Sequence, residues 1–154
     1  IEKLALEGNP NAYDFPRPMI HSDNLDMSLS GLKTAVLYTV QKIKDLDQSK
    51  KADIAASFQK AVTDLLVTKI KKAVKETNRK DVIIAGGVVA NKFIRSKFKE
   101  LEDSLGIKVY YPDLKYCGDN AAMIAFVGSM MSVNKKGNNR SQVRARWPLD
   151  ELKQ

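Results

Sequence analysis

The sequence predicts an α/β fold that is rich in helix and has a small, mainly parallel sheet. Residues 82–133 read as strand, helix, strand and helix, an order typical of parallel strands with helices on the faces of the sheet. A long segment before them has apolar residues at helical spacing. Two strands are too few for a complete doubly wound domain, so we expect the missing strands in a preceding segment.

The first fifty residues are predicted to alternate between helical and irregular segments. A short helix over residues 1–7 precedes a stretch whose two prolines exclude helix. Alternating apolar and polar residues at 26–30 predict a short strand. Ser28 or Ser30 can then cap a helix that begins near Gly31.

The remaining elements follow from hydrophobic periodicity. A continuous apolar stripe predicts a long helix over residues 53–76, and the β-branched run at 82–85 predicts a buried strand. A second helix is expected from about 88 to 105, and a second short strand at 108–111. The last helix is expected at about 120–133.

Length, charge and composition limit the possible domain organisation of the chain and the class of protein to which it belongs. Its 154 residues fit one domain, and we expect a lobe over residues 1–133 and a basic loop and tail over 134–154. The net charge of +8 suits either a polyanionic partner such as RNA or a well-solvated surface. No apolar run is long enough to span a membrane, and the single cysteine, Cys117, indicates a reducing cytoplasm.

Two adjacent glycines separate the predicted strand at 82–85 from the helix that follows. Gly86 and Gly87 therefore lie where α/β proteins bind ligands, at the carboxyl end of a strand. Their bare backbone admits a flat ring or a phosphate, and the helix start offers unpaired N–H groups. Asn91 can hydrogen-bond a ribose or a base. The alternative is a tight turn that binds nothing.

The loop Cys117-Gly118-Asp119-Asn120 offers a second candidate site. Asp119 can be the N-cap of the last helix, or it can ligate a metal ion through its carboxylate. One carboxylate cannot hold a catalytic metal, and the chain has only one histidine, His21, so further ligands would come from elsewhere. Cys117 fits a small buried residue better than a nucleophile.

Three stretches together resemble one family: DMSLSGLKTAV (26–36), IIAGGVVANKFIR (83–95) and YPDLKYCGDNAAMIA (111–125). They are similar to the C-terminal part of the universal tRNA N6-adenosine threonylcarbamoyltransferases, formerly called O-sialoglycoprotein endopeptidases. The resemblance implies part of an RNase-H-like lobe of the actin/Hsp70/sugar-kinase superfold. It also implies a transferase that moves the threonylcarbamoyl group of threonylcarbamoyl-AMP to N6 of the adenosine beside the anticodon, in tRNAs that read codons starting with A.

The resemblance also assigns roles to individual residues. It implies a substrate and nucleotide site that includes Ser30, Lys33, Gly86, Gly87 and Asn91. It implies that Asp119 ligates one divalent metal ion, with iron as the first choice and zinc or magnesium as alternatives. Two histidines of an HxxxH motif, which this chain lacks, would complete that metal site. The family's usual CTDNGAMIA reads CGDNAAMIA here, which keeps the aspartate and the asparagine.

The partners that the resemblance implies are tRNA, an adenylate-forming synthase, a homologous scaffold protein and a small ATPase. The basic residues Lys135, Lys136, Arg140 and Arg144 are candidates for contact with tRNA phosphates. We expect the chain by itself to be inactive. Two alternatives stay open at this point: a small-molecule kinase of the same superfold, and a non-catalytic module that binds RNA or protein.

Overall fold

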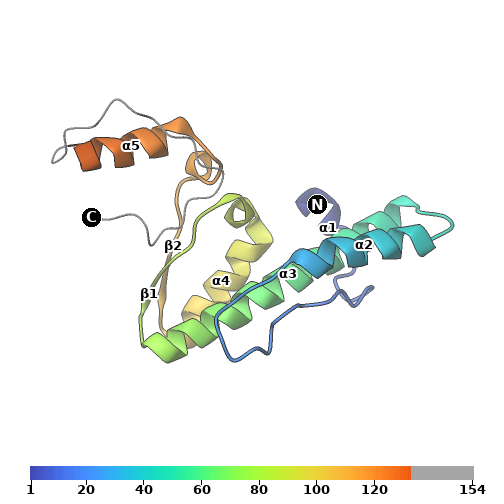
Figure 1. Ribbon diagram of the computed structural model, residues 1–154. Coiled ribbons are helices and arrows are strands. Elements are labelled where there is room, and N and C mark those ends of the chain that lie inside the picture. The colour runs from blue at the N-terminus through green and yellow to red at the C-terminus, as the bar shows by residue number, and fades with distance from the viewer. Residues whose placement is uncertain (133–154) are drawn as a thin grey trace. The chain divides into compact units, whose positions relative to one another are not determined.

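The computed structural model describes residues 1–132. Residues 1–119 form one compact unit, and a second unit begins at Asn120. The first unit contains, in order, α1 (Glu2–Ala5), α2 (Ser30–Lys42), α3 (Gln48–Thr77), β1 (Asp81–Ile83), the 3-10 turn η1 (Gly87–Ala90), α4 (Lys92–Leu105), β2 (Lys108–Tyr110) and the 3-10 turn η2 (Leu114–Tyr116) (Figure 1). Helix α5 (Ala121–Ser132) belongs to the second unit.

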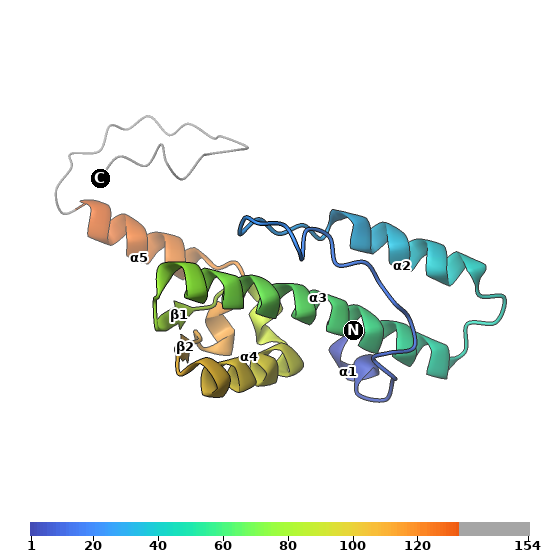
Figure 2. The same cartoon turned by 90° about the horizontal axis from the view of Figure 1, so that it is seen from below.

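Helix α3 is the scaffold of the first unit. Its 30 residues extend over ~45 Å, at 1.5 Å per residue. Helices α1, α2 and α4 all pack against α3. Figures 1 and 2 show α1 and α2 beside its first half and α4 with the sheet beside its second half. The apolar stripe predicted from the sequence therefore supports both ends of the unit.

One apolar cluster joins α2, α3, α4 and the sheet, whereas Ala5 of α1 packs in a separate small cluster with Ala55 and Ala56 of α3. Phe98 of α4 is fully buried at the centre of the larger cluster, and Leu32 of α2 and Val62 of α3 belong to the same cluster. Val36 and Val40 of α2 are partly buried and pack against this cluster. The apolar stripe predicted for the long helix is thus confirmed as its buried face. The buried members of the larger cluster are Phe15, Leu32, Ile54, Ala61, Val62, Ile94, Phe98, Leu101, Ile107 and Val109.

The sheet consists of β1 and β2, which pair in parallel. Val82 faces Val109 across the pair, and both are partly or fully covered. Ile83 pairs with Tyr110 on the opposite face and is 80% exposed. The predicted helix-rich fold with a small parallel sheet is confirmed, but the prediction of a buried strand at 82–85 is wrong for one of its faces. Helices cover only the other face in this unit, and a run of β-branched residues does not reveal that difference.

Residues 9–24 form a segment without helix or strand, here called the strap. Side chains of α3 satisfy its backbone. Asp53 accepts a hydrogen bond from the Asn9 N–H at 2.7 Å. The Ser57 hydroxyl donates to the Asn9 carbonyl oxygen at 3.2 Å and accepts from the Tyr13 N–H at 3.1 Å. The first part of the strap is therefore fixed to α3 through main-chain groups.

The second part of the strap is held by charged side chains. The Arg17 guanidinium lies 2.9 Å from the Asp64 carboxylate. Lys69 is only 2% exposed, and its ammonium group donates to the Ser22 carbonyl, the Ser22 hydroxyl and the Asn24 carbonyl at 3.2, 2.7 and 2.8 Å. All three donors of this buried cation are thus satisfied by neutral oxygens. The bonded pairs lie 44 to 48 residues apart, so the strap runs in the same direction as α3.

The predicted strand at 26–30 does not form. The Asn24 side chain accepts from the Asp26 N–H at 3.3 Å and donates to the Asp26 carboxylate at 2.6 Å. Local side-chain bonds of this kind compete with strand pairing. The predicted serine cap is also wrong, because α2 begins at Ser30 behind Leu29 with no side-chain cap bond.

Helix α3 begins at Gln48, five residues before the predicted start at 53. Asp47 is its N-cap and accepts from the Lys50 N–H at 2.8 Å, which also lowers the pKa of the Asp47 carboxyl. The first turn is polar, so the apolar stripe alone gave no sign of it. The C-terminal end is as expected, with Asn78 in the left-handed conformation.

Helix α5 is described by itself. It carries no charged residue, and Ile124 and Phe126 are 76% and 66% exposed. The predicted helix at 120–133 is confirmed within one residue at each end. Within residues 1–132, none of the helices combines the length and the hydropathy that a membrane crossing requires.

We predict that Gly8→Ala destabilises the first unit. A Cβ at this position would fall on the Ala52 carbonyl oxygen of α3, so α1 would have to move away. The free energy of unfolding, measured by urea denaturation, should fall by about 1–3 kcal/mol. Gly31→Ala is the matched control, because its Cβ would meet nothing closer than Pro18 at 3.8 Å. A loss no larger at position 8 than at position 31 would contradict the close packing.

We also predict that Lys69→Met loosens the strap. The change leaves the carbonyl oxygens of Ser22 and Asn24 without their buried donor, and we expect a loss of about 1–3 kcal/mol in the free energy of unfolding. Amide hydrogen exchange at residues 20–26 should rise with it. Lys71→Met, at an exposed position of the same helix, is the control and should change stability by under ~0.5 kcal/mol. Equal losses in the two variants would argue against a role of Lys69 in holding the strap.

Candidate functional site

The glycine pair forms a tight turn after β1. Gly86 has φ 97° and ψ 169°, a conformation that glycine adopts far more readily than other residues. A Cβ built on Gly86 would have no atom within 4 Å. The expected helix from 88 is replaced by η1, and α4 starts only at Lys92 because Asn91 has extended backbone. The turn itself thus requires Gly86, and the space beside it is open.

Asn91 joins the turn to α3. Its side-chain oxygen accepts from the Ile94 N–H at 3.0 Å, which makes it the N-cap of α4. Its amide nitrogen donates to the Gln59 side-chain oxygen at 2.7 Å. An amide group has two N–H donors and two acceptor positions, so Asn91 keeps one of each for another partner. The residue predicted to bind substrate therefore also has a structural role.

A cavity of about 360 Å³ opens between this turn and α3. Gly87 and Asn91 line it from the turn, Phe58 and Gln59 from α3, and Leu29 from the segment before α2. Ligand pockets of proteins commonly measure 300–1,000 Å³ and combine an apolar lining with a few polar groups. The Asn91–Gln59 amide pair is such a group. Two of the predicted site residues therefore share one cavity.

The start of α4 is less open than the sequence suggested. Glu2 of α1 accepts from the Lys92 N–H at 2.7 Å, and Asn91 accepts from the Ile94 N–H. Two of the N–H groups that we expected to be unpaired are therefore bonded. The carboxylate of Glu2 also adds a negative charge at the edge of the cavity. A phosphate at this position would have to displace Glu2 or bind beside it.

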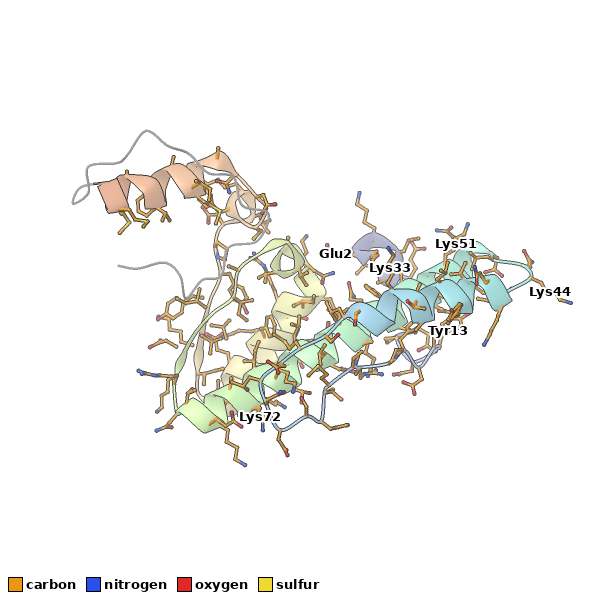
Figure 3. The ribbon with its side chains drawn as sticks, in the orientation of Figure 1. Glu2, Tyr13, Lys33, Lys44, Lys51 and Lys72 are labelled. Atoms are coloured by element: carbon orange, nitrogen blue, oxygen red, sulfur yellow. The ribbon has the colours of Figure 1, made fainter. Side chains whose placement is uncertain are left out.

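Lys33 and Ser30 lie apart from the Asn91 cavity. Lys33 and Lys51, both labelled in Figure 3, line a neighbouring cavity of about 370 Å³. The two cavities share Ile1 and Phe58. Ser30 is exposed, lines neither cavity, and its hydroxyl lies 2.9 Å from that of Ser28. The structure thus places Lys33 next to the candidate site and Ser30 outside it.

Asp119 is not the cap of the last helix. The Asn120 side chain accepts from the Met123 N–H at 3.0 Å and takes that position instead. Asp119 is exposed, and within residues 1–132 it makes no hydrogen bond or ion pair. Its carboxylate is therefore available to a ligand. No group of three His, Cys, Asp or Glu side chains suited to a metal ion exists in the same residues, so Asp119 fits a metal site as one ligand among others.

The two predicted halves of the site approach each other at Cys117. A Cβ built on Gly87 would lie 3.8 Å from the Cys117 carbonyl oxygen. Cys117 is buried, as predicted, and lies two residues before Asp119. The glycine turn and the loop that carries Asp119 are therefore neighbours at the carboxyl ends of the two parallel strands. The predicted tRNA-binding residues Lys135, Lys136, Arg140 and Arg144 lie outside the described residues.

Sequence reasoning missed Glu2 and Gln59. Gln59 follows Phe58 on α3 and is buried, but its bond to Asn91 joins residues 32 positions apart, which the sequence alone does not show. Glu2 gave no signal, because its contact with Lys92 joins residues 90 positions apart. Both residues line the Asn91 cavity.

Comparisons with known proteins agree on one family. The family model of tRNA N6-adenosine threonylcarbamoyltransferase matches residues 1–126. A relative of that name from Thermosipho africanus is 51% identical over 137 residues, which cover 89% of this chain and 41% of the relative. Another of that name, from Neisseria meningitidis, is 42% identical over 170 residues, covering 99% of this chain and 48% of the relative.

The matches cover most of this chain, which spans less than half the length of each of these curated relatives. The family model nevertheless extends over most of the chain, including the glycine turn, Asn91 and the loop that carries Asp119. The chain therefore belongs to the tRNA N6-adenosine threonylcarbamoyltransferase family.

Proposed function

We propose that this chain forms part of a site that transfers a threonylcarbamoyl group from threonylcarbamoyl-AMP to N6 of the adenosine beside the anticodon of tRNA. The tRNAs are those that read codons starting with A, and the reaction takes place in the cytoplasm. The observation that carries the proposal is the cavity lined by Gly87 and Asn91, in a chain 51% identical to a relative with this name. That name favours the transferase over a kinase or a non-catalytic module.

The reaction exchanges one bond at the carbamoyl carbon. A bond forms between adenosine N6 and this carbon, the bond from the carbon to the phosphate oxygen breaks, and N6 loses one proton. AMP is the leaving group. N6 of adenine is a poor nucleophile, so holding it against an activated anhydride supplies much of the rate. The task of the protein is therefore to bind two adenosines in a fixed geometry.

The glycine turn and Asn91 are suited to the adenylate. The open space beside Gly86 lets a flat ring approach the backbone. Asn91 offers the N–H that is left over from its bond to Gln59, and the cavity wall around it is largely apolar, as in ligand pockets of proteins. Because Asn91 is held at both of its amide atoms, it presents that N–H in one orientation. A fixed donor binds a ligand without a further loss of side-chain freedom.

Asp119 is suited to a divalent metal ion that this chain shares with ligands from elsewhere. When bound, such an ion supplies Lewis-acid polarisation of a carbonyl group. The carboxylate of Asp119, which is exposed and has no ion pair among residues 1–132, is the group of this chain that would hold it, with iron as the first choice. Lys33, in the neighbouring cavity, is placed to attract a phosphate.

Binding of tRNA rests on the charge of the C-terminal residues. Lys135, Lys136, Arg140 and Arg144 lie in a segment without acidic residues, and a cluster of basic residues contacts a phosphate backbone irrespective of sequence. The further partners that we propose are a synthase that makes the adenylate, a homologous scaffold protein and a small ATPase.

Two variants of Asn91 separate its structural role from its role in binding. Asn91→Asp keeps the acceptor that caps α4, and Gln59 can turn its amide to donate, but the remaining N–H donor of a residue that lines the cavity is lost. We expect little change in stability and at least a ~10-fold loss of AMP affinity by calorimetry, close to the value of one hydrogen bond. Asn91→Ala should also cost about 1 kcal/mol of stability through the lost cap. Unchanged AMP affinity in Asn91→Asp would refute the binding role.

Asp119→Asn tests the metal ligand. The change removes the charge and keeps the size of the side chain, so we expect the metal content of the protein to fall at least ~10-fold by mass spectrometry. Transfer of labelled threonine to tRNA should fall with it, measured with a protein that contains this chain and the remaining length of its relatives. Asp113→Asn, at another exposed aspartate of the same loop, is the control. Full metal content in Asp119→Asn would refute the assignment.

A further inference from the structure

Arg95 of α4 bonds to two separate loops. Its Nε–H donates to the Val89 carbonyl oxygen in η1 at 2.6 Å. A terminal N–H group lies 3.4 Å from the Pro112 carbonyl oxygen and 3.5 Å from the Cys117 sulfur, both in the loop after β2. One guanidinium thus holds the turn after the first strand and the loop after the second.

Arg95 is partly buried against an aromatic ring and takes part in no ion pair among residues 1–132. Its guanidinium carbon lies 5.0 Å from the centre of the Tyr111 ring. Burial raises the pKa of the Tyr111 hydroxyl above an ordinary value that already leaves the ring under the cation neutral at physiological pH. Arg95 bonds carbonyl oxygens and a sulfur and stacks on a ring face. Its role therefore depends on the planar arrangement of its N–H donors and not on an ion pair.

The two loops that Arg95 joins are those on which the candidate site depends. Val89 follows Gly86 and Gly87 by two or three residues, and Cys117 precedes Asp119 by two. Cys117 itself has its thiol directed at the Asp113 carbonyl oxygen, 3.7 Å away, so the loop is folded around the sulfur that Arg95 contacts. A shift of Arg95 would therefore move both loops together.

We propose that Arg95 is a positioning residue that fixes the glycine turn at 86–87 relative to the carboxylate at 119. Its structural part rests on the contacts above, and its consequence for catalysis rests on the proposed function. Lysine does not replace it, because a single ammonium nitrogen lacks the separate donors, spaced across a plane, that reach Val89 and Pro112 from one side chain.

Amide hydrogen exchange of the 154-residue chain tests the structural part. Arg95→Met keeps the length of the side chain and removes every donor. We expect exchange at residues 86–91 and 113–119 to become at least ~10-fold faster, and alkylation of Cys117 by the neutral reagent iodoacetamide to accelerate likewise. Exchange in the middle of α3 should stay at the wild-type rate.

Two controls distinguish positioning from general loss of stability. Lys97→Met changes a cation two residues further along the same helix, whose ion pair is with Glu100, and should leave both loops unchanged. Phe98→Leu weakens the core and should accelerate exchange throughout the first unit. If Arg95→Met resembles Phe98→Leu, or loosens only one loop or neither, the proposal is wrong. If Arg95→Met does not fold, Arg95→Lys replaces it in the same experiment. In Arg95→Lys we expect faster amide exchange in at least the loop at 113–119.

Transfer assays separate this proposal from the proposed function. In a protein with the remaining length of the relatives, Arg95→Lys should lower kcat at least ~10-fold while KM for tRNA stays within ~2-fold, because misplacement of reacting groups affects turnover more than tRNA contact. If the wild-type protein shows no transfer activity, the proposed function is refuted. If both loops are nevertheless loosened in Arg95→Met, the structural role of Arg95 in joining them still holds. Active wild type with unchanged kcat in Arg95→Lys would refute the catalytic consequence.

Discussion

The first unit depends on the contacts of one helix, α3. Its apolar face packs against α2, α4 and the inner face of the sheet, and its polar side chains satisfy the main chain of the strap. Helices in folded proteins owe most of their stability to tertiary packing of their apolar face and less to propensity. A 30-residue helix with this many partners gives the short elements around it a common support. The β1–α4 turn is positioned by the same helix, through the bond between Gln59 and Asn91.

Most helices and strands of the structure could be predicted from the pattern of apolar residues along the sequence. The helices α2, α3, α4 and α5 were expected from apolar patterns of period 3.6, and the two strands from short apolar runs. Their parallel arrangement was expected from the order strand, helix, strand. Element starts were predicted less well: the polar first turn of α3 and the 3-10 turn before α4 carry no apolar signal. The exposure of Ile83 was missed because covering a sheet face depends on residues distant in sequence.

In the candidate site, too, some residues could be predicted from the sequence and others only from the structure. Gly86, Gly87 and Asn91 were predicted from residue type and position after a strand, and Asp119 from its carboxylate in the loop before the last helix. Their partners were not, because Glu2, Gln59 and Arg95 meet the site through contacts 90, 32 and up to 22 residues apart in sequence. Residue chemistry identified the groups suited to a ligand. The groups that hold them in place emerged only from the fold.

The strap has an evolutionary consequence. It advances along α3 at a nearly constant offset of 44 to 48 residues, and each bond joins a specific strap residue to a specific helical one. An inserted or deleted residue in α3 rotates the later side chains by about 100° around the axis, given 3.6 residues per turn, and turns Asp64 or Lys69 away from its partner. Length changes in this part of the chain should therefore accumulate in the α2–α3 connection, which lies outside the paired segments.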